Sequence, residues 1–191
     1  MRKTLALAAL LVALAGCSMQ TRYTLSVDVL SFLGDVVEGN VPSGAFEVYL
    51  PDDDDGDLAT PDPDGTLVEA GLGADRLEAI RLELTATIAN TGTIPLDLSA
   101  EVYVGDAGTN DLYHGSGTQI GSASLTLAAG ESGALTLLVE LKPGDPGFDL
   151  VAAGSFRVGT KLQGFGDGFS FRLEELKLAL TTKRLGELLR P

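Results

Sequence analysis

The chain has 191 residues, of which 13 are Lys or Arg and 27 are Asp or Glu, so its formal net charge at pH 7 is -14. Nucleic-acid binding requires clustered bases that neutralise phosphates, and this excess of acids excludes DNA and RNA as partners. Hydrophobic residues make up 45% of the chain and charged residues 21%, proportions that allow a buried core and exclude general disorder. The length fits one domain, or two at most.

The first residues have the pattern of a secretory signal. Arg2 and Lys3 precede an apolar run of about a dozen residues, mainly Leu, Ala and Val, and small residues come just before Cys17. A membrane-spanning helix needs about 20 apolar residues, so this run is too short to span a bilayer. We therefore expect residues 1–16 to be removed as a signal peptide.

The sequence Leu14-Ala15-Gly16-Cys17 resembles the lipobox of bacterial lipoproteins. The resemblance implies that Cys17 is lipid-modified and becomes the mature N-terminus, and Ser18 after it favours delivery to the outer membrane. Two or three acyl chains, as the resemblance implies, give stable anchoring where a single chain holds only weakly. The alternative is that Cys17, the only cysteine, is an ordinary buried or free thiol of a secreted protein.

The expected mature chain is strongly acidic. Without residues 1–16 it has 11 Lys and Arg against 27 Asp and Glu, a net charge of -16. Residues 17–22 are a short lipidated tether, and residues 23–191 are expected to form one domain. Because anionic headgroups repel such a body within a Debye length of roughly 8 Å, we expect the lipid, rather than surface charge, to hold the protein on the membrane.

Alternation of apolar and polar residues predicts an all-β domain. Leu82 to Ile88 and Leu96 to Val104 have apolar residues at every second position, which buries one face of each strand. Turn-forming segments such as Asn90-Thr91-Gly92, Gly105 to Gly117 and Gly164 to Gly168 separate such runs. About eight strands without a convincing amphipathic helix predict a two-sheet antiparallel β-sandwich. The other predicted strands are residues 23–29, 46–50, 123–127, 135–141, 156–162 and 169–180.

One predicted strand changes the parity of its apolar residues. Phe169 to Leu173 place one parity on the core side, whereas Leu176 to Leu180 place the other parity there. Either a β-bulge at Glu174-Glu175 or a passage of the strand from one sheet to the other would account for this change. The alternation elsewhere predicts one core that includes Leu84, Ile88, Leu98, Val102, Leu125 and Leu137.

Residues 84–141 also resemble the LEA14-type (water-stress) β-sandwich domain and the adhesion-type domains of bacterial envelope proteins. The resemblance is carried by Thr87 to Leu96 and by Ile120 to Ser132. It implies a non-catalytic module, although LEA14-type domains usually have Asn-Pro-Asn where this chain has Asn90-Thr91-Gly92. A generic immunoglobulin-like sandwich explains the same residues, and fold alone does not supply a function.

The aspartate-rich stretch 51–65 is the candidate metal site. Ca²⁺ takes six to eight oxygen ligands, which clustered carboxylates around a sharp turn can supply. With Gly56 at the sixth position of an EF-hand loop, however, Pro51 occupies the first position and Asp62 the twelfth, so the motif fails at both ends. A solvated acidic loop is the alternative. The candidate Ca²⁺ ligands are Asp53, Asp55, Asp57, Asp62 and Asp64, and no other cofactor is expected.

Catalytic groups are not evident in the sequence. His114 is the only histidine, which excludes a multi-histidine zinc site. Two residues to either side of Ser116 stand His114 and Thr118, where a nucleophile elbow has glycines. Glu174 and Glu175 are adjacent in a strand and are expected to point to opposite faces, unlike the carboxylates of a glycosidase. We therefore predict a protein that is not an enzyme.

Tyr49 and Tyr103 fall on the polar side of their strands. They either stack on a sugar or cover a sheet face that is not fully wet, and the absence of Trp makes a carbohydrate platform a minor hypothesis.

The sequence as a whole predicts a lipid-anchored, non-enzymatic protein of the bacterial cell envelope. It would act as an interaction, assembly or stress-protective module, bound to the membrane by its lipid and to an envelope protein that the sequence does not identify. A Ca²⁺-dependent adhesion or carbohydrate-binding domain is the alternative, with stretch 51–65 as the discriminating feature, and an envelope hydrolase is the third hypothesis.

Overall fold

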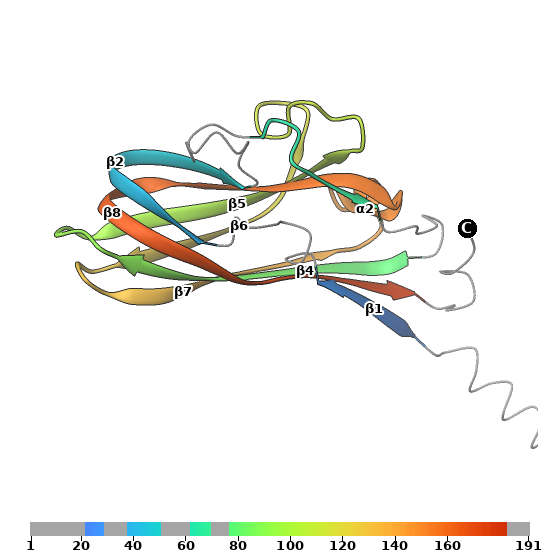
Figure 1. Cartoon of the computed structure of the whole chain (residues 1–191). Helices are drawn as coiled ribbons and strands as arrows, with labels where there is room; N and C mark the ends of the chain where they lie inside the picture. Colours follow the sequence, from blue (N-terminus) through green and yellow to red (C-terminus); the bar gives the residue numbers. More distant parts are fainter. Residues whose placement is uncertain (1–21, 29–37, 51–61, 70–76, 183–191) are drawn as a thin grey trace, which may run out of the picture.

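The computed structural model of the chain describes residues 22–28, 38–50, 62–69 and 77–182 (Figure 1). These residues form eight strands and one short helix, which confirms the all-β prediction. The elements are β1 (Tyr23–Asp28), β2 (Glu38–Leu50), β3 (Thr66–Glu69), β4 (Leu77–Asn90), β5 (Leu96–Asp106), β6 (Thr118–Leu127), β7 (Ser132–Leu141), α2 (Phe148–Ala152) and β8 (Ser155–Thr182).

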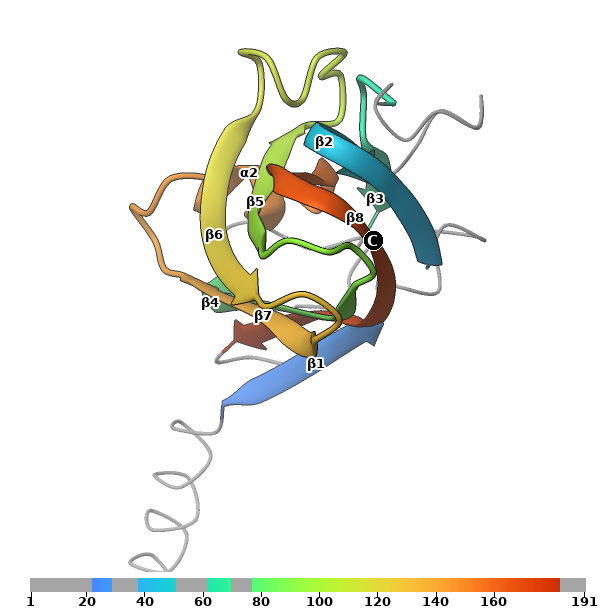
Figure 2. The same cartoon turned by 90° about the vertical axis from the view of Figure 1, so that its left-hand side faces the viewer.

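The 28-residue strand β8 belongs to both layers of a sandwich. One of its edges pairs with β5 and then with β4, and the other edge pairs in turn with β3, β2 and β1. Figure 1 shows β8 running along the upper layer, curving at one end and returning along the lower layer. β6 pairs with β5 and β7 pairs with β4, so the strand order is β6-β5-β8-β4-β7, and these strands curve round the core in Figure 2.

The bend of β8 lies at three alternating glycines. A Cβ on Gly164 would collide with the backbone carbonyl oxygen of Asp97 on β5, so glycine is needed for this close approach of two strands. Gly168 has a φ of 104°. On the paired strand β2, Gly44 has a φ of 122° and lies opposite Gly166 of β8. The prediction of a turn at these residues is wrong, because β2 pairs with β8 across the whole bend and keeps it within one strand.

The change of parity in β8 is produced by a β-bulge at the predicted place. Thr85 of β4 pairs with Glu175, whereas the next residue of β4 pairs with Leu173, so Glu174 has no partner in the register with β4. As a result Leu173 and Leu176 are both buried. The passage between layers, which was the alternative explanation, also occurs, but at the glycine bend.

The same bulge places Glu174 and Glu175 on one face, so the prediction of opposite faces is wrong. The hydroxyl of Thr87 donates a hydrogen bond to Glu174 Oε1 at 3.0 Å, and Lys177 forms an ion pair with Glu175. Both carboxylates lie on the outer side of the sheet, because the extra residue of a bulge interrupts the alternation. Each is held by a different neighbour rather than by a shared one.

The hydrophobic core lies between the two layers, as the alternation predicts. Leu125 is only partly buried, because β6 is a terminal strand of the order, but it packs against the same cluster. The predicted core residues that are fully buried are Leu84, Ile88, Leu98, Val102 and Leu137.

Two short elements, α2 and β3, were not predicted from the sequence. The helix α2 packs Phe148, Val151 and Ala152 against the core and follows Gly147, whose φ is 81°. β3 has only four residues, and a segment of that length shows no periodicity. β2 also begins at Glu38, eight residues before the predicted start at Phe46.

Asn90 ties two turns together at one end of the sandwich. Its side chain is buried, and Nδ2 lies 2.8 Å from the carbonyl oxygen of Ile94 and 3.0 Å from that of Ala128. Its Oδ1 accepts a hydrogen bond from the Gly92 N–H at 3.0 Å. Because a buried amide is stable only when its polar atoms are paired, Asn90 holds the β4–β5 and β6–β7 connections in a fixed relation.

Candidate functional site

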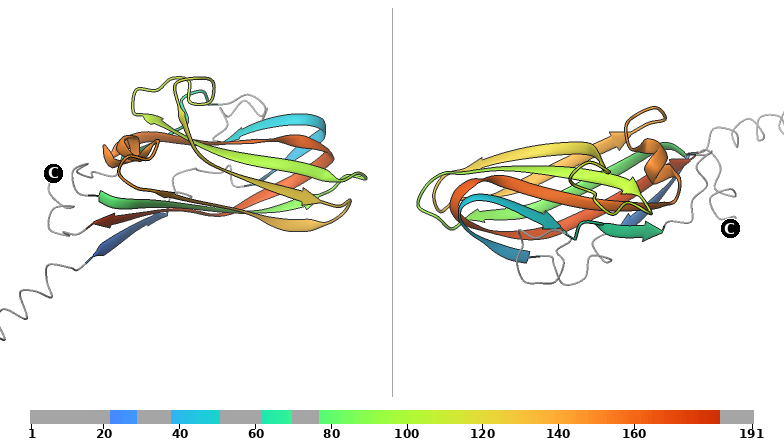
Figure 3. Two further views of the ribbon diagram at one scale, coloured as in Figure 1. Left: turned by 180° about the vertical axis from the view of Figure 1, so that it is seen from behind. Right: turned by 90° about the horizontal axis from the view of Figure 1, so that it is seen from above.

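The connection between β5 and β6, residues 107–117, folds over the outer face of the layer that contains β5 (Figures 1 and 3). Its Leu112 and Tyr113 are buried together with Tyr49 of β2, and Tyr103 of β5 packs against them. The ring centroid of Tyr113 lies 4.9 Å from that of Tyr49 and 5.8 Å from that of Tyr103. The tyrosines therefore cover a sheet face, and Tyr49, which is 3% exposed, is not available to stack on a sugar.

Each phenol of this tyrosine cluster (Tyr49, Tyr103 and Tyr113) donates a hydrogen bond. The acceptors are Glu47 Oε2 for Tyr49 at 2.7 Å, Glu101 Oε2 for Tyr103 at 2.8 Å, and the Leu50 carbonyl oxygen for Tyr113 at 3.0 Å. Burial, reinforced by the adjacent carboxylates, raises the pKa of Tyr49 and that of Tyr103 to about 12. Burial also raises the pKa of Tyr113. All three phenols therefore stay protonated at neutral pH.

Lys161 links the cluster to β8. Its Nζ lies 2.9 Å from Glu47 Oε1 and 5.9 Å from the ring centroid of Tyr49, within the range of a cation–π contact. The hydrogen bond from Lys161, followed by that from Tyr49, lowers the pKa of Glu47. Glu47 thus accepts from both neighbours as a carboxylate.

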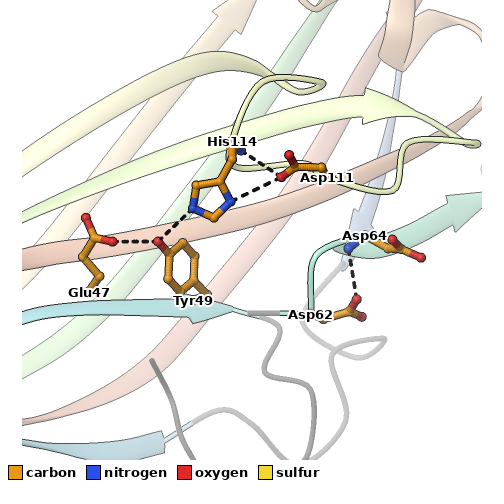
Figure 4. Close-up of polar contacts among 6 residues, drawn as sticks. All are labelled: Glu47, Tyr49, Asp62, Asp64, Asp111 and His114. Carbon is orange, nitrogen blue, oxygen red and sulfur yellow. Dashed lines mark hydrogen bonds and ion pairs between the residues drawn. The ribbon is translucent and has the colours of Figure 1, made fainter. Parts of the chain in front are cut away.

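His114 extends this network to the loop (Figure 4). Its Nε2 lies 3.5 Å from the Tyr49 hydroxyl oxygen and its Nδ1 lies 3.3 Å from Asp111 Oδ1. Its side chain is 57% exposed, as expected for a loop histidine. The order Asp111, His114, Tyr49 is that of an acid–base relay, but the Tyr49 hydroxyl donates to Glu47 and its raised pKa makes it a weak nucleophile. In the described part of the chain, the ring contacts Asp111 and Tyr49 and makes no hydrogen bond with Ser116.

The connection 107–117 also makes hydrogen bonds to the described residues on either side of residues 51–61. The Tyr113 hydroxyl donates to the carbonyl oxygen of Leu50, the residue before that stretch. The Leu112 N–H donates to the carbonyl oxygen of Pro63 at 2.6 Å. The described ends of the stretch are therefore attached to the loop 107–117.

Arg157 of β8 contacts both the connection 107–117 and the described end of the aspartate-rich stretch. Its guanidinium donates to the carbonyl oxygen of Ala107 at 3.2 Å and to that of Gly65 at 2.9 Å. It also lies 3.7 Å from the carboxylate of Asp64. One arginine thus contacts both segments. We call the connection 107–117 together with residues 62–65 the platform; it lies at this end of the upper layer.

The candidate Ca²⁺ ligands are only partly within the described residues. Asp62 Oδ1 accepts a hydrogen bond from the Asp64 N–H at 3.1 Å, and Asp64 faces Arg157. Within the described ranges, no three His, Cys, Asp or Glu side chains are placed to hold a metal ion. The Ca²⁺ site stays a prediction, because the candidates outside the described residues are Asp53, Asp55 and Asp57.

Cys17 and the apolar run before it also lie outside the described residues. In the part of the chain that the structure does describe, no helix is both long enough and apolar enough to cross a membrane.

The roles of Tyr113, Glu47 and Lys161 were not predicted from the sequence. The available signal was the apolar pair Leu112-Tyr113 within a connection rich in Gly, Asp and Ser, since isolated large apolar residues in such a segment are typical of a loop that packs onto the body. Glu47 and Lys161 belong to different strands, so no local pattern relates them.

Replacement of Glu47 by Gln should weaken the protein most at neutral pH. A carboxyl whose pKa is lowered by folding stabilises the protein above its ordinary pKa, and this stabilisation is lost as the pH falls through the lowered value. The melting temperature of Glu47→Gln should therefore lie below that of the unmodified protein at pH 7 and approach it by pH 3. The matched control is Glu140→Gln on the exposed side of β7. A gap that persists unchanged at pH 3 would contradict the role assigned to the Glu47 carboxylate.

Comparison with known proteins finds no matching protein family and no matching curated protein. Several solved structures are distantly similar. A chain of infectious bursal disease virus Gt strain is 9% identical with a TM-score of 0.42, covering 86% of this chain and 33% of that chain. The CBM22-1-GH10 modules of Clostridium thermocellum xylanase 10B, complexed with xylohexaose, are 13% identical with a TM-score of 0.35, covering 83% of this chain and 28% of that chain.

A third structure, Eiger TNF from S. frugiperda, is 8% identical with a TM-score of 0.36, covering 76% of this chain and 91% of that chain. The chain spans about a third or less of the length of the viral and xylanase chains. These likenesses are too distant to carry an inference about function.

Proposed function

We propose that the protein is a lipid-anchored, non-enzymatic β-sandwich of the bacterial cell envelope that binds another envelope component. The observation that carries the proposal is the sequence Leu14-Ala15-Gly16-Cys17, with its cysteine five residues before Arg22 and six before β1. Acylation of Cys17 would hold the folded domain on the membrane, because two or more acyl chains bind a bilayer stably.

The short tether determines which part of the domain lies near the bilayer. Residues 18–22 span at most about 17 Å when fully extended. Figures 1 and 2 show β1 at the margin of the lower layer and the connection 107–117 over the upper layer. An anchor on Cys17 would therefore keep the β1 side near the membrane and leave the platform of loops accessible to a partner.

The chemistry of that platform supports binding rather than catalysis. Tyr49 and Tyr103 have pKa values raised to about 12, and their hydroxyl protons are donated to Glu47 and Glu101. A nucleophile needs the opposite arrangement, in which an adjacent base removes the proton and the pKa is lowered. These groups instead fix the shape of the loop, as expected for a surface that recognises a partner.

Replacement of Cys17 by Ser should release the protein from the membrane. The serine hydroxyl does not replace the thiol in lipid attachment, so the variant is expected in the soluble fraction while the unmodified protein sediments with membranes. Mass measurement of the N-terminal peptide should show acylation only in the unmodified protein.

The matched control is Ser18→Ala, which changes a neighbouring small polar residue and keeps the cysteine. It should remain in the membrane fraction. Unchanged sedimentation of Cys17→Ser would remove the basis of the proposed anchoring. Crosslinking from native membranes, with a photoreactive residue at Ser116 on the platform and a second variant at the exposed Leu138 of β7, would then identify the component that the platform contacts.

A further inference from the structure

β1 is attached to the domain differently from the strands around it. Thr24, Leu25, Ser26 and Asp28 are exposed, and Leu25 keeps 42% of its surface accessible although its partner Leu180 is fully buried. None of the β1 side chains that the structure describes belongs to either apolar cluster. The β1 side chains that the structure describes therefore add little apolar burial to the folded state.

The backbone ladder to β8 is the main attachment of β1. Tyr23 to Asp28 pair with Thr182 to Lys177, and among the strands that the structure describes β1 pairs with β8 alone. The side-chain contacts at this edge include an exposed Arg22–Glu78 ion pair at 3.1 Å and a contact between the hydroxyl oxygens of Thr24 and Thr181 at 3.4 Å. Exposed ion pairs contribute little to stability.

β8 does not depend on β1 for its place in the sheet. Over the residues that pair with β1, its other edge pairs with β4, from Leu77 opposite Thr182 to Glu83 opposite Lys177. Leu178 and Leu180 are buried in the main apolar cluster, to which no described β1 side chain belongs. Loss of β1 would thus expose one edge of β8 and leave its pairing with β4 in place.

We propose that β1 is a releasable strand that sets the reach of the membrane anchor, an inference that rests on the proposed function. With β1 paired, the five residues 18–22 limit the tether to about 17 Å. With β1 released, the chain from residue 18 to β2 comprises 20 residues, with a contour length of about 70 Å. Strand release would let the same domain contact partners at two distances from the bilayer.

Hydrogen exchange measured on the purified full protein tests the release of β1. The protein is kept in detergent if the chain carries lipid and in buffer if it does not. Local opening exposes amides without global unfolding. The amides of β1 that pair with β8 should exchange at least about 100-fold faster than those of the central strand β5, from Leu98 to Val104. Protection of β1 equal to that of β5 would overturn the proposal.

A disulfide lock supplies the matched control. The paired variant Thr24→Cys with Thr181→Cys joins positions whose hydroxyl oxygens are 3.4 Å apart, and Cys17 is either acylated or changed to Ser. Oxidation should slow exchange of the paired β1 amides by tenfold or more, and reduction of the same sample should restore fast exchange. Equal exchange in the two states would show that β1 does not open on its own.

A second pair of variants connects release to the anchor. Ser26→Pro removes a backbone donor of β1, whereas Ser26→Ala keeps it. In lipid-bearing protein on vesicles, energy transfer from a bilayer dye to a label at Ser122→Cys should fall in Ser26→Pro relative to Ser26→Ala. Equal transfer would overturn the role of β1 in reach. Fast exchange of β1 in a protein that carries no lipid would refute the anchoring and leave strand release standing.

Discussion

Replacement of Leu98 by Ala should lower the free energy of unfolding by about 2 to 5 kcal/mol, the range for truncation of a buried leucine. Leu98 is 2% exposed and lies on β5, between β6 and β8 in the strand order. Removing its side chain forfeits the transfer free energy of the lost carbons and leaves a cavity that paired strands on both sides cannot close. For a domain of this size, the melting temperature should fall by roughly 5 to 20 °C.

The matched control is Leu138→Ala on β7, where the side chain is 51% exposed. The same atoms are removed there without creating a cavity, so the free energy of unfolding should change by no more than about 0.5 kcal/mol. Denaturant and thermal unfolding of the two variants side by side measure the difference. Equal stability of Leu98→Ala and Leu138→Ala would mean that the register of β5 is not the one described.

Replacement of Gly164 by Ala should destabilise the protein by about 3 kcal/mol, the upper part of the usual range for overpacking. The added Cβ would collide with the backbone carbonyl oxygen of Asp97 and would lie 2.9 Å from Cζ of Phe46. A backbone oxygen within a strand ladder cannot move aside as a flexible side chain can. Relief of the collision requires β5 and β8 to separate at the point where β8 passes between layers.

Gly108→Ala is the control for this change. A Cβ at Gly108, in the turn after β5, would meet only Asp106 Oδ1 at 3.3 Å, the end of a side chain that can rotate. Its free energy of unfolding should stay within about 0.5 kcal/mol of the unmodified protein. If Gly164→Ala were as stable as Gly108→Ala, the two strands would not approach as closely at the bend as the structure indicates.

The sequence alone was sufficient to predict the all-β class, most strands and the core. These features depend on the period of apolar residues along a single segment, which backbone geometry converts into one buried face. Leu84, Ile88 and Leu98 are buried for that reason. The bulge at Glu174 was one of two explanations that the sequence left open, because a local break in parity has few structural solutions.

The candidate site was much less predictable, because its residues are brought together from distant segments. Tyr49 and Tyr113 are 64 positions apart, and their packing depends on how the connection 107–117 returns over β2. Lys161 and Glu47 meet because β8 and β2 run antiparallel in one register.

The glycines at 164, 166 and 168 show that structure can be hard to predict from sequence even within a single segment. Their composition is typical of a turn, and the residues themselves fit either a turn or a bend. Pairing with β2 on one edge, and with β5 then β4 on the other, makes continuation of the strand more stable than its interruption. Local chemistry thus determined which segments form strands, whereas pairing between remote segments determined where one strand ends and which side chains meet.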